Sequence, residues 1–197
     1  MRLYISPGNT KTGNIPSVSL PPLETCPIDA PCRQKGQGYC HKLCTLRPRL
    51  ATTLIDNLEY YNNNSAGYFQ KITAYLKYAN TRFFRWHIFG DIPDPKYFTQ
   101  VKLTARKTPD IKHLIFTKRF AWIKIFHHIP DNLSVVFSMW NNYGDPSINF
   151  PKSWYLDPRN PDPRIPANAL ECPGNCETCG SCWHLKQLNK DVILHRH

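Results

Sequence analysis

Eight cysteines form two groups of four, one near each end of the chain. The first cysteine group has the spacing C-x5-C-x7-C-x3-C and consists of Cys26, Cys32, Cys40 and Cys44. The second cysteine group has the spacing C-x3-C-x2-C-x2-C and consists of Cys172, Cys176, Cys179 and Cys182. Clustered thiolates are typical ligands of iron–sulfur clusters and of zinc. We therefore predict that all eight thiols are metal and cofactor ligands.

The spacing of the second cysteine group favours a [4Fe–4S] cluster. Its three gaps are all short, whereas zinc sites often separate two CxxC pairs by a longer loop. Gly174 and Gly180 allow tight backbone turns between the ligands. Each group matches one four-thiol site, so we expect two clusters, while a single centre with ligands from both ends stays open. Zinc is the alternative metal, and disulfides are disfavoured in a reducing compartment.

Three of the cysteines also spell CxxxCxxC, the motif of radical S-adenosylmethionine enzymes. Cys172, Cys176 and Cys179 carry it, but that superfamily normally places the motif after the first barrel strand. Thr178 stands where an aromatic residue is expected, and Cys182 supplies a fourth ligand. The literal match is therefore weak.

Three functional hypotheses follow from the cysteines. The first is an iron–sulfur protein with one or two [4Fe–4S] clusters, used in electron transfer or in reductive chemistry. The second is a zinc-binding protein that binds nucleic acid. The third is an enzyme like the radical S-adenosylmethionine enzymes. The sequence does not decide whether the protein is an enzyme.

Composition predicts a packed protein with a basic surface. The 197 residues are 41% hydrophobic and 13% aromatic, which is typical of one globular domain. We divide that single domain, 1–197, into a cysteine-rich segment at 1–50, an α/β core at 51–140 and a proline-rich and cysteine-rich segment at 141–197.

The net charge of +11 favours anionic partners, such as a redox partner protein or an anionic small molecule. Nucleic acid is possible but not favoured, because the charges are scattered. The N-terminus lacks the apolar run of a signal peptide, and no stretch has the length of a membrane span, so we expect a cytoplasmic protein.

The middle of the chain alternates between helix and strand patterns. Apolar residues recur at helical spacing from Ala51, with Leu54, Ile55, Leu58 and Tyr61 on one face, and a second helix should begin near Ser65. Strands are predicted at 17–20, in "RFFRWHIFGD", at 113–118, at 133–140 and in "DVILHRH". Helices are predicted over "PDPKYFTQVKLTARK", with Tyr97, Val101 and Leu103 toward the core, and over "FAWIKIFHH". Residues 141–171 are expected to be loop.

These spacings indicate βαβ units, and so an α/β fold. We expect a parallel sheet or a partial (β/α) barrel with cysteine-rich segments at both termini. Active residues of such folds gather at the carboxyl ends of the strands. The polar residues predicted there are Asp91, Thr117, Lys118 and Ser138.

Asp91 and Lys118 are the catalytic candidates among these polar residues. Asp91 is suited to orient a ligand or to take a proton, and Lys118 to meet a phosphate or carboxylate. The alternatives are a helix N-cap for Asp91 and a solvated charge for Lys118. Asn9 and Lys11 lie in a loop that is expected to bind an anion or to pack against the cluster.

Several ordered motifs together resemble the phage and plasmid family called gene product 88. They are "SPGNTKTGNIPSVSLPP", the first cysteine group, "FGDIPDPKYF", "TPDIKHLIFTK" and "CETCGSCW…VILHRH", and they run from about Ser6 to His195. The resemblance implies a cysteine-rich, cytosolic bacteriophage-type protein with a partial barrel like that of radical S-adenosylmethionine enzymes. It assigns no reaction.

Overall fold

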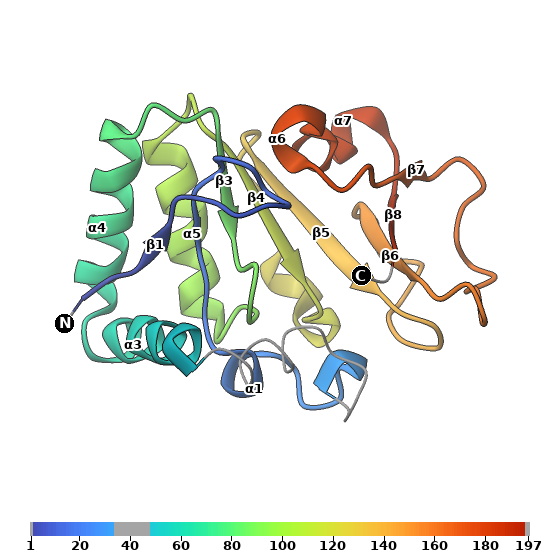
Figure 1. Ribbon diagram of the computed structural model, residues 1–197, viewed down its shortest axis with the longest axis horizontal. Helices are drawn as coiled ribbons and strands as arrows, with labels where there is room; N and C mark the ends of the chain where they lie inside the picture. Colours follow the sequence, from blue (N-terminus) through green and yellow to red (C-terminus); the bar gives the residue numbers. More distant parts are fainter. Residues whose placement is uncertain (1, 34–47, 196–197) are drawn as a thin grey trace.

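One sheet of eight strands organises the molecule. The computed structural model describes residues 2–33 and 48–195, and Figure 1 shows their arrangement. The strand order is β1-β2-β3-β4-β5-β6-β8-β7; β1 is antiparallel to β2, and every other neighbouring pair is parallel. The predicted α/β fold with a mainly parallel sheet is therefore confirmed.

The described elements have the following bounds. The strands are β1 Ile5–Ser6, β2 Ser17–Val18, β3 Phe83–Trp86, β4 Lys112–Thr117, β5 Leu133–Met139, β6 Lys152–Leu156, β7 Leu170–Glu171 and β8 Val192–His195. The α-helices are α1 Pro22–Thr25, α3 Pro48–Asn63, α4 Ser65–Tyr78, α5 Pro95–Lys107, α6 Cys176–Cys179 and α7 Leu185–Leu188. The 3-10 helices are η1 Pro31–Arg33, η2 Phe120–Ile125 and η3 Ser181–Trp183. Strands from 1–50 and from 141–195 thus join the same sheet as the strands of 51–140.

Side-chain caps fix where the two helices beside the sheet begin. Asn64 accepts a 2.8 Å hydrogen bond from Gly67 N at the start of α4. Asp94 accepts a 2.9 Å bond from Tyr97 N at the start of α5, and Pro95 follows it in the first turn. The N-cap after β3 is therefore Asp94, and the alternative reading of Asp91 as this cap does not hold.

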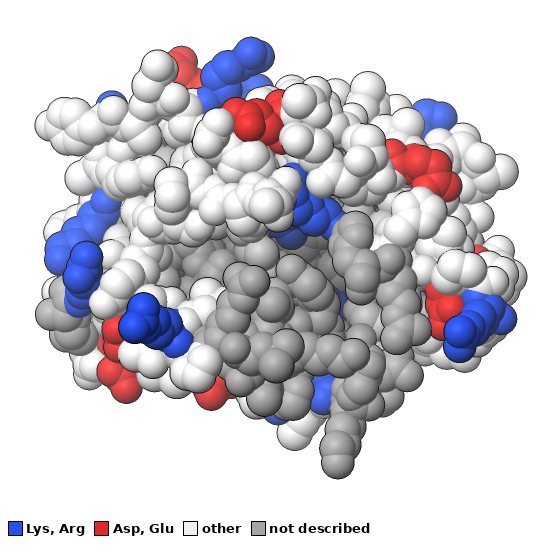
Figure 2. Space-filling view, in the orientation of Figure 1, with Lys and Arg blue, Asp and Glu red and all other residues white. Residues whose placement is uncertain are grey.

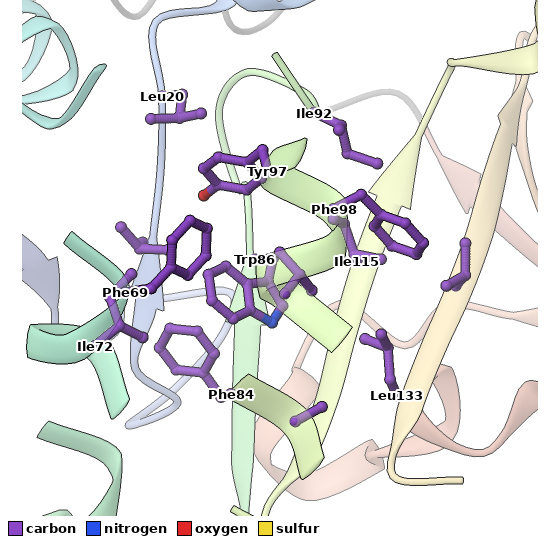
Figure 3. Close-up of a cluster of buried hydrophobic side chains, with 14 of the residues drawn as sticks. Leu20, Phe69, Ile72, Phe84, Trp86, Ile92, Tyr97, Phe98, Ile115 and Leu133 are labelled. Carbon is purple, nitrogen blue, oxygen red and sulfur yellow. The ribbon is translucent and has the colours of Figure 1, made fainter. Parts of the chain in front are cut away.

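One face of the sheet is covered by α4 and α5. Figure 3 shows Phe69 from α4 and Tyr97 from α5 directed toward Trp86 of β3. Trp86 and Tyr97 have no exposed surface, and burying each such side chain contributes roughly 1.5–3 kcal/mol. This apolar layer fixes the positions of β3 and β4, and hence of the residues that follow their ends.

Two side chains predicted to face the core are exposed instead. Ile55 is 42% exposed and Leu103 is 36% exposed. In each helix the buried stripe follows a neighbouring set of positions, which in α5 includes Val101, Thr104 and Ala105. Helical periodicity identifies an apolar stripe, but only packing against the sheet selects its centre.

The opposite face of the sheet is covered by the C-terminal segment. Leu114 and Val136 of the sheet pack with Trp183 and Leu185, and Cys176 and Cys182 are partly buried against them. Figure 1 shows α6 and α7 on the side of the strands away from α4 and α5. The second cysteine group therefore lies against the sheet.

The prediction of loop for residues 141–171 needs correction. Residues 141–171 are not all loop, because they contain β6, which lies between β5 and β8, and β7. Pro151 limits β6 to a five-residue strand, too short to give a clear pattern in the sequence. The segment "FAWIKIFHH", predicted as a short helix, forms the short 3-10 helix η2, with a non-helical Trp122. Among the helices of 2–33 and 48–195, none combines the length and apolar character needed to cross a membrane.

Candidate functional site

The two cysteine groups lie at opposite ends of the parallel strands. Cys26 and Cys32 are in the loop that follows β2, beside residues that come directly after β3 and β4. In the second group, Cys182 O accepts a 2.9 Å bond from Ser134 Oγ near the start of β5. Figure 1 shows α1 near the carboxyl ends of the strands and α6 near the amino ends. The described thiols of the two groups therefore do not converge on one centre.

Cys26 and Cys32 form a hydrogen-bonded pair of thiols. That bond and burial raise the pKa of Cys26, whereas the same bond lowers the pKa of Cys32. The positive charge of Lys118 favours the thiolate of both, and the charge of Asp91 opposes it. Cys40 and Cys44, the other predicted ligands of this group, lie outside the described residues.

Asp91 is a buried carboxylate that joins the ends of two strands. It is 2% exposed, and it accepts bonds of 2.7 Å from Thr117 Oγ1, from Lys118 N and from Ile92 N. Burial raises its pKa, while the charge of Lys118 and these hydrogen bonds oppose the rise. The carboxylate is thus held rigidly between β3 and β4.

The loop that carries Cys26 is fastened to the same edge of the sheet. Asp91 N donates a 3.1 Å bond to Thr25 Oγ1, and Arg119 donates to Thr25 O and Ile92 O. Gly90 has φ +79°, and a Cβ there would lie 2.5 Å from Leu20 O. β3 ends at Trp86, so Gly90 and Asp91 lie in the segment that follows the strand and not at its predicted end. These contacts explain why that segment contains Gly-Asp, a pair that allows close approach of the cysteine loop.

A cavity adjoins this carboxyl-end site. It has a volume of about 500 Å³, and Lys118, Arg119, Trp122, Tyr143 and Asp29 are among its lining residues. Burial first, and then the charges of Asp29, Asp91 and Cys32, raise the pKa of Tyr143. The cavity is therefore next to the thiol pair and presents both cationic and aromatic side chains.

Ser138, the remaining predicted strand-end residue, does not line this cavity. Its Oγ accepts a 3.3 Å bond from Ser153 Oγ.

Short elements gather the four thiols of the second cysteine group. The side chain of Asn175 caps α6 by accepting a 3.2 Å bond from Thr178 N, and Gly180 ends α6 with φ +63°. Cys172 N bonds to Ile193 O of β8, and Cys176 N bonds to Lys11 O, each within 3.0 Å. The loop of Asn9 and Lys11 thus packs against this group, one of the two roles predicted for it.

The four thiols of the second group influence one another electrostatically. Burial first, and then the charges of Cys176, Cys172 and Cys179, raise the pKa of Cys182 to about 12. Burial also raises the pKa of Cys176, and the nearby charge of Arg85 opposes both shifts. Cys179 is exposed, and its thiol donates a 3.1 Å bond to Ser181 Oγ.

The gathered thiols are not arranged as a preformed metal site. All six cysteines within 2–33 and 48–195 are free thiols. Nevertheless, no set of three or more His, Cys, Asp or Glu side chains in those ranges has metal-binding geometry. The donor type and number fit a four-thiolate centre.

Arg85 and Ser17 are two further polar residues on the sheet, and neither was predicted to have a functional role. Their Nε and Oγ atoms are buried without a hydrogen-bond partner among the described residues. The sequence does contain a sign of such a role for Arg85. An arginine inside the aromatic segment "RFFRWHIF" implies an anionic or polar neighbour, because a buried charge needs a partner.

Comparison with known proteins identifies a family. Searches of curated proteins and of solved structures found no match to the chain. A family model described as gene product 88 matches residues 5–185, a range that includes β1 to β7, all eight cysteines and Asp91. The match covers far more than half of the chain, so the protein belongs to the gene product 88 family.

Proposed function

We propose that the protein binds iron–sulfur clusters, one at each cysteine group, and serves in electron transfer or reductive chemistry. A [4Fe–4S] cluster supplies one-electron redox chemistry when bound. In this proposal Cys172, Cys176, Cys179 and Cys182 hold one cluster, and Cys26, Cys32, Cys40 and Cys44 hold the other. The proposal includes a cytoplasmic location, where a reducing environment keeps clustered thiols available as ligands.

The gathering of four free thiols around α6 and η3 is the observation that carries the proposal. Placing acidic groups near one another raises the free energy of their charged forms, so four neighbouring thiols are disfavoured as thiolates without a cation. Arg85 offsets only part of this effect at Cys176 and Cys182. A bound iron–sulfur centre supplies the missing positive charge and is held through all four sulfurs.

The residues at the carboxyl ends of the strands suggest where a reaction would take place. The cavity beside Cys32 is lined by Lys118 and Arg119, whose charges suit an anionic small molecule or an acidic surface of a redox partner. Asp91 fixes the backbone at Lys118 through its 2.7 Å bond. We therefore assign substrate or partner binding to this edge, with the second group as a separate redox centre.

Anaerobic purification followed by iron, sulfide and zinc analysis tests the proposal. We expect a brown protein with about four irons and four sulfides per cluster, and a paramagnetic spectrum after reduction with dithionite. A colourless protein with stoichiometric zinc and no sulfide would overturn the iron assignment. That result would favour a zinc-binding protein, for which nucleic-acid binding would then be measured as a function of salt.

Serine substitution tests the assignment of the second cysteine group. Cys182→Ser should lose most of the iron bound at this group, because an alcohol is a poor replacement for a thiolate ligand. Ser181→Ala is the matched control, since Ser181 is the adjacent residue and accepts a bond from Cys179. Full cluster loading in Cys182→Ser would show that this thiol is not a required ligand.

An enzyme like the radical S-adenosylmethionine enzymes is the second candidate. It is favoured by the place of the first cysteine group, which follows β2, the first of the parallel strands. The test adds S-adenosylmethionine to the reduced protein and records the paramagnetic spectrum of the cluster. A perturbed spectrum that depends on Cys26 and Cys32 supports this candidate, and an unchanged spectrum argues against it.

Nucleic-acid binding receives less support from the surface. On the face shown in Figure 2, Lys and Arg side chains are scattered and alternate with acidic ones. Nucleic-acid-binding surfaces instead gather basic residues into a patch or stripe. An iron–sulfur protein with a charged cavity therefore remains the function that we propose.

A further inference from the structure

A row of register-paired residues crosses the sheet beneath the second cysteine group. Ser17 of β2 pairs with Arg85 of β3, Arg85 with Leu114 of β4, and Leu114 with Ser134 of β5. Paired residues of neighbouring strands project from the same face of a sheet. Leu114 packs with Trp183 in the apolar cluster on the side of the C-terminal segment. The whole row therefore faces this segment.

Two polar atoms in this row are buried and unpaired. Arg85 Nε and Ser17 Oγ have no hydrogen-bond partner within the described part of the chain, and Ser17 is 1% exposed. An unsatisfied buried polar group costs about 1–3 kcal/mol, so it calls for a physical explanation. Ser134, at the other end of the row, shows what the row contacts, because its Oγ donates to Cys182 O at 2.9 Å.

The charge of Arg85 acts on the thiols of the second group. Its guanidinium lies 4.9 Å from the centre of the Phe116 ring, which holds it against the sheet. From there its charge favours the thiolate forms of Cys176 and Cys182. Two buried donors and one positive charge thus lie on the face of the sheet against which Cys172, Cys176 and Cys182 pack.

We propose that Arg85 and Ser17 are positioning residues for the metal centre of the second cysteine group, and that they donate hydrogen bonds to its anionic sulfur atoms. This inference rests on the proposed metal binding at this group. Arg85 Nε–H and the Ser17 hydroxyl are the donors, and the Arg85 charge offsets the negative charge of the ligated thiolates. Hydrogen bonds to cluster sulfur and nearby positive charge both favour the reduced, more negative state.

Two measurements on the same variants test this role. All variants also carry Cys26→Ser and Cys32→Ser, which remove two proposed ligands of the first cysteine group. Metal bound at the second cysteine group then dominates both measurements. Cobalt(II) is titrated into the metal-free protein, and thiolate-to-cobalt absorption reports the affinity without requiring an active enzyme. The reduction midpoint of the iron-loaded protein is then measured anaerobically. Arg85→Gln, Arg85→Lys and Ser17→Ala are compared with Arg82→Gln, a control at the neighbouring exposed arginine.

Arg85→Gln should weaken cobalt binding by roughly tenfold or more, the usual effect of losing a group that supports metal ligands. It should also shift the reduction equilibrium about tenfold toward the oxidised state, or about 59 mV to more negative potential for one electron. Arg85→Lys keeps the charge but loses the Nε–H donor and should lie between Arg85→Gln and the parent protein. Ser17→Ala should weaken cobalt binding less than Arg85→Gln, and Arg82→Gln should match the parent protein.

The outcomes separate this inference from the proposed function. A parent protein that binds no cobalt and no iron overturns both. Normal metal binding with the same affinity and midpoint in Arg85→Gln overturns only the role of Arg85. If circular dichroism shows that Arg85→Gln does not fold, Arg85→Lys and Ser17→Ala decide, and unchanged values in both overturn the inference.

Discussion

Asp91 Oδ2 accepts a 2.7 Å hydrogen bond from the backbone N–H of Lys118. The bond joins the residue that follows the turn after β3 to the first residue after β4. Thr117 Oγ1 and Ile92 N donate to the other carboxylate oxygen, Oδ1, also at 2.7 Å. One buried side chain therefore sets the distance between two strand ends and fixes the edge of the sheet where Cys26 lies.

Asp91→Asn should destabilise the protein by about 2 kcal/mol. The amide keeps the shape of the carboxylate but turns an N–H group toward a donor, either Lys118 N or the Thr117 and Ile92 pair. Denaturant unfolding measures the change in the free energy of unfolding. Asp145→Asn is the control, because Asp145 is exposed and bonds only locally, to Ser147. Equal stability of the two variants would show that the Asp91 bonds contribute little.

Gly90→Ala should destabilise the protein by about 3 kcal/mol, through backbone strain and a steric clash. Gly90 has φ +79°, and an added Cβ would meet Leu20 O at 2.5 Å. Gly174→Ala is a matched comparison, since Gly174 has φ +87° but no atom within 4 Å of the added Cβ. It should cost only about 1 kcal/mol. Thermal or denaturant unfolding distinguishes the two, and similar losses would contradict the close approach at Gly90.

Protein stability should fall as the pH drops below about 6.5, partly because of His113. Burial lowers its pKa from 6.5 to about 3. His113 Nδ1 accepts a 3.2 Å bond from Trp86 Nε1, so the folded protein holds the neutral ring. The unfolded chain takes up a proton between these pKa values and the folded protein does not, so each pH unit lowers the free energy of unfolding by about 1.4 kcal/mol per such histidine.

The variant His113→Gln isolates this contribution. Its free energy of unfolding should depend less steeply on pH between 6 and 5, by about 1.4 kcal/mol per unit at the lower end. His127→Gln is the control for removal of a histidine from the surface, because His127 is exposed. A slope in His113→Gln equal to that of the natural protein would contradict a neutral buried His113.

Metal binding should protect the second cysteine group from alkylation. In the metal-free protein, Cys179 should react with iodoacetamide before Cys182, because Cys179 is exposed, whereas Cys182 is partly buried and its pKa is raised to about 12. Loading under anaerobic conditions should slow the reaction at all four thiols of the group. Mass spectrometry of peptides gives the extent at each cysteine, and rapid modification of Cys179 in the loaded protein would exclude it as a ligand.

The sequence by itself determined the class of fold and the positions of the two cysteine groups. The two cysteine groups are local patterns, and helix and strand periodicity is also local, so both can be recognised without knowing distant contacts. The strands β4 and β5 and the helices α3, α4 and α5 follow the predicted segments closely, whereas β3 ends at Trp86, before the predicted end at Gly90-Asp91. The other exceptions were β6, which is short and follows a proline, and the centres of the buried helix stripes.

Only the tertiary structure decided how these parts are placed together. The two cysteine groups lie at opposite ends of the strands, and Arg85 and Ser17 lie in one row beneath the second group. The register of the sheet makes neighbours of Ser17 and Arg85, which are 68 positions apart in the chain. No local sequence spacing encodes that register. The sequence identified the thiols, while the register of the sheet determined which charges and hydrogen-bond donors surround them.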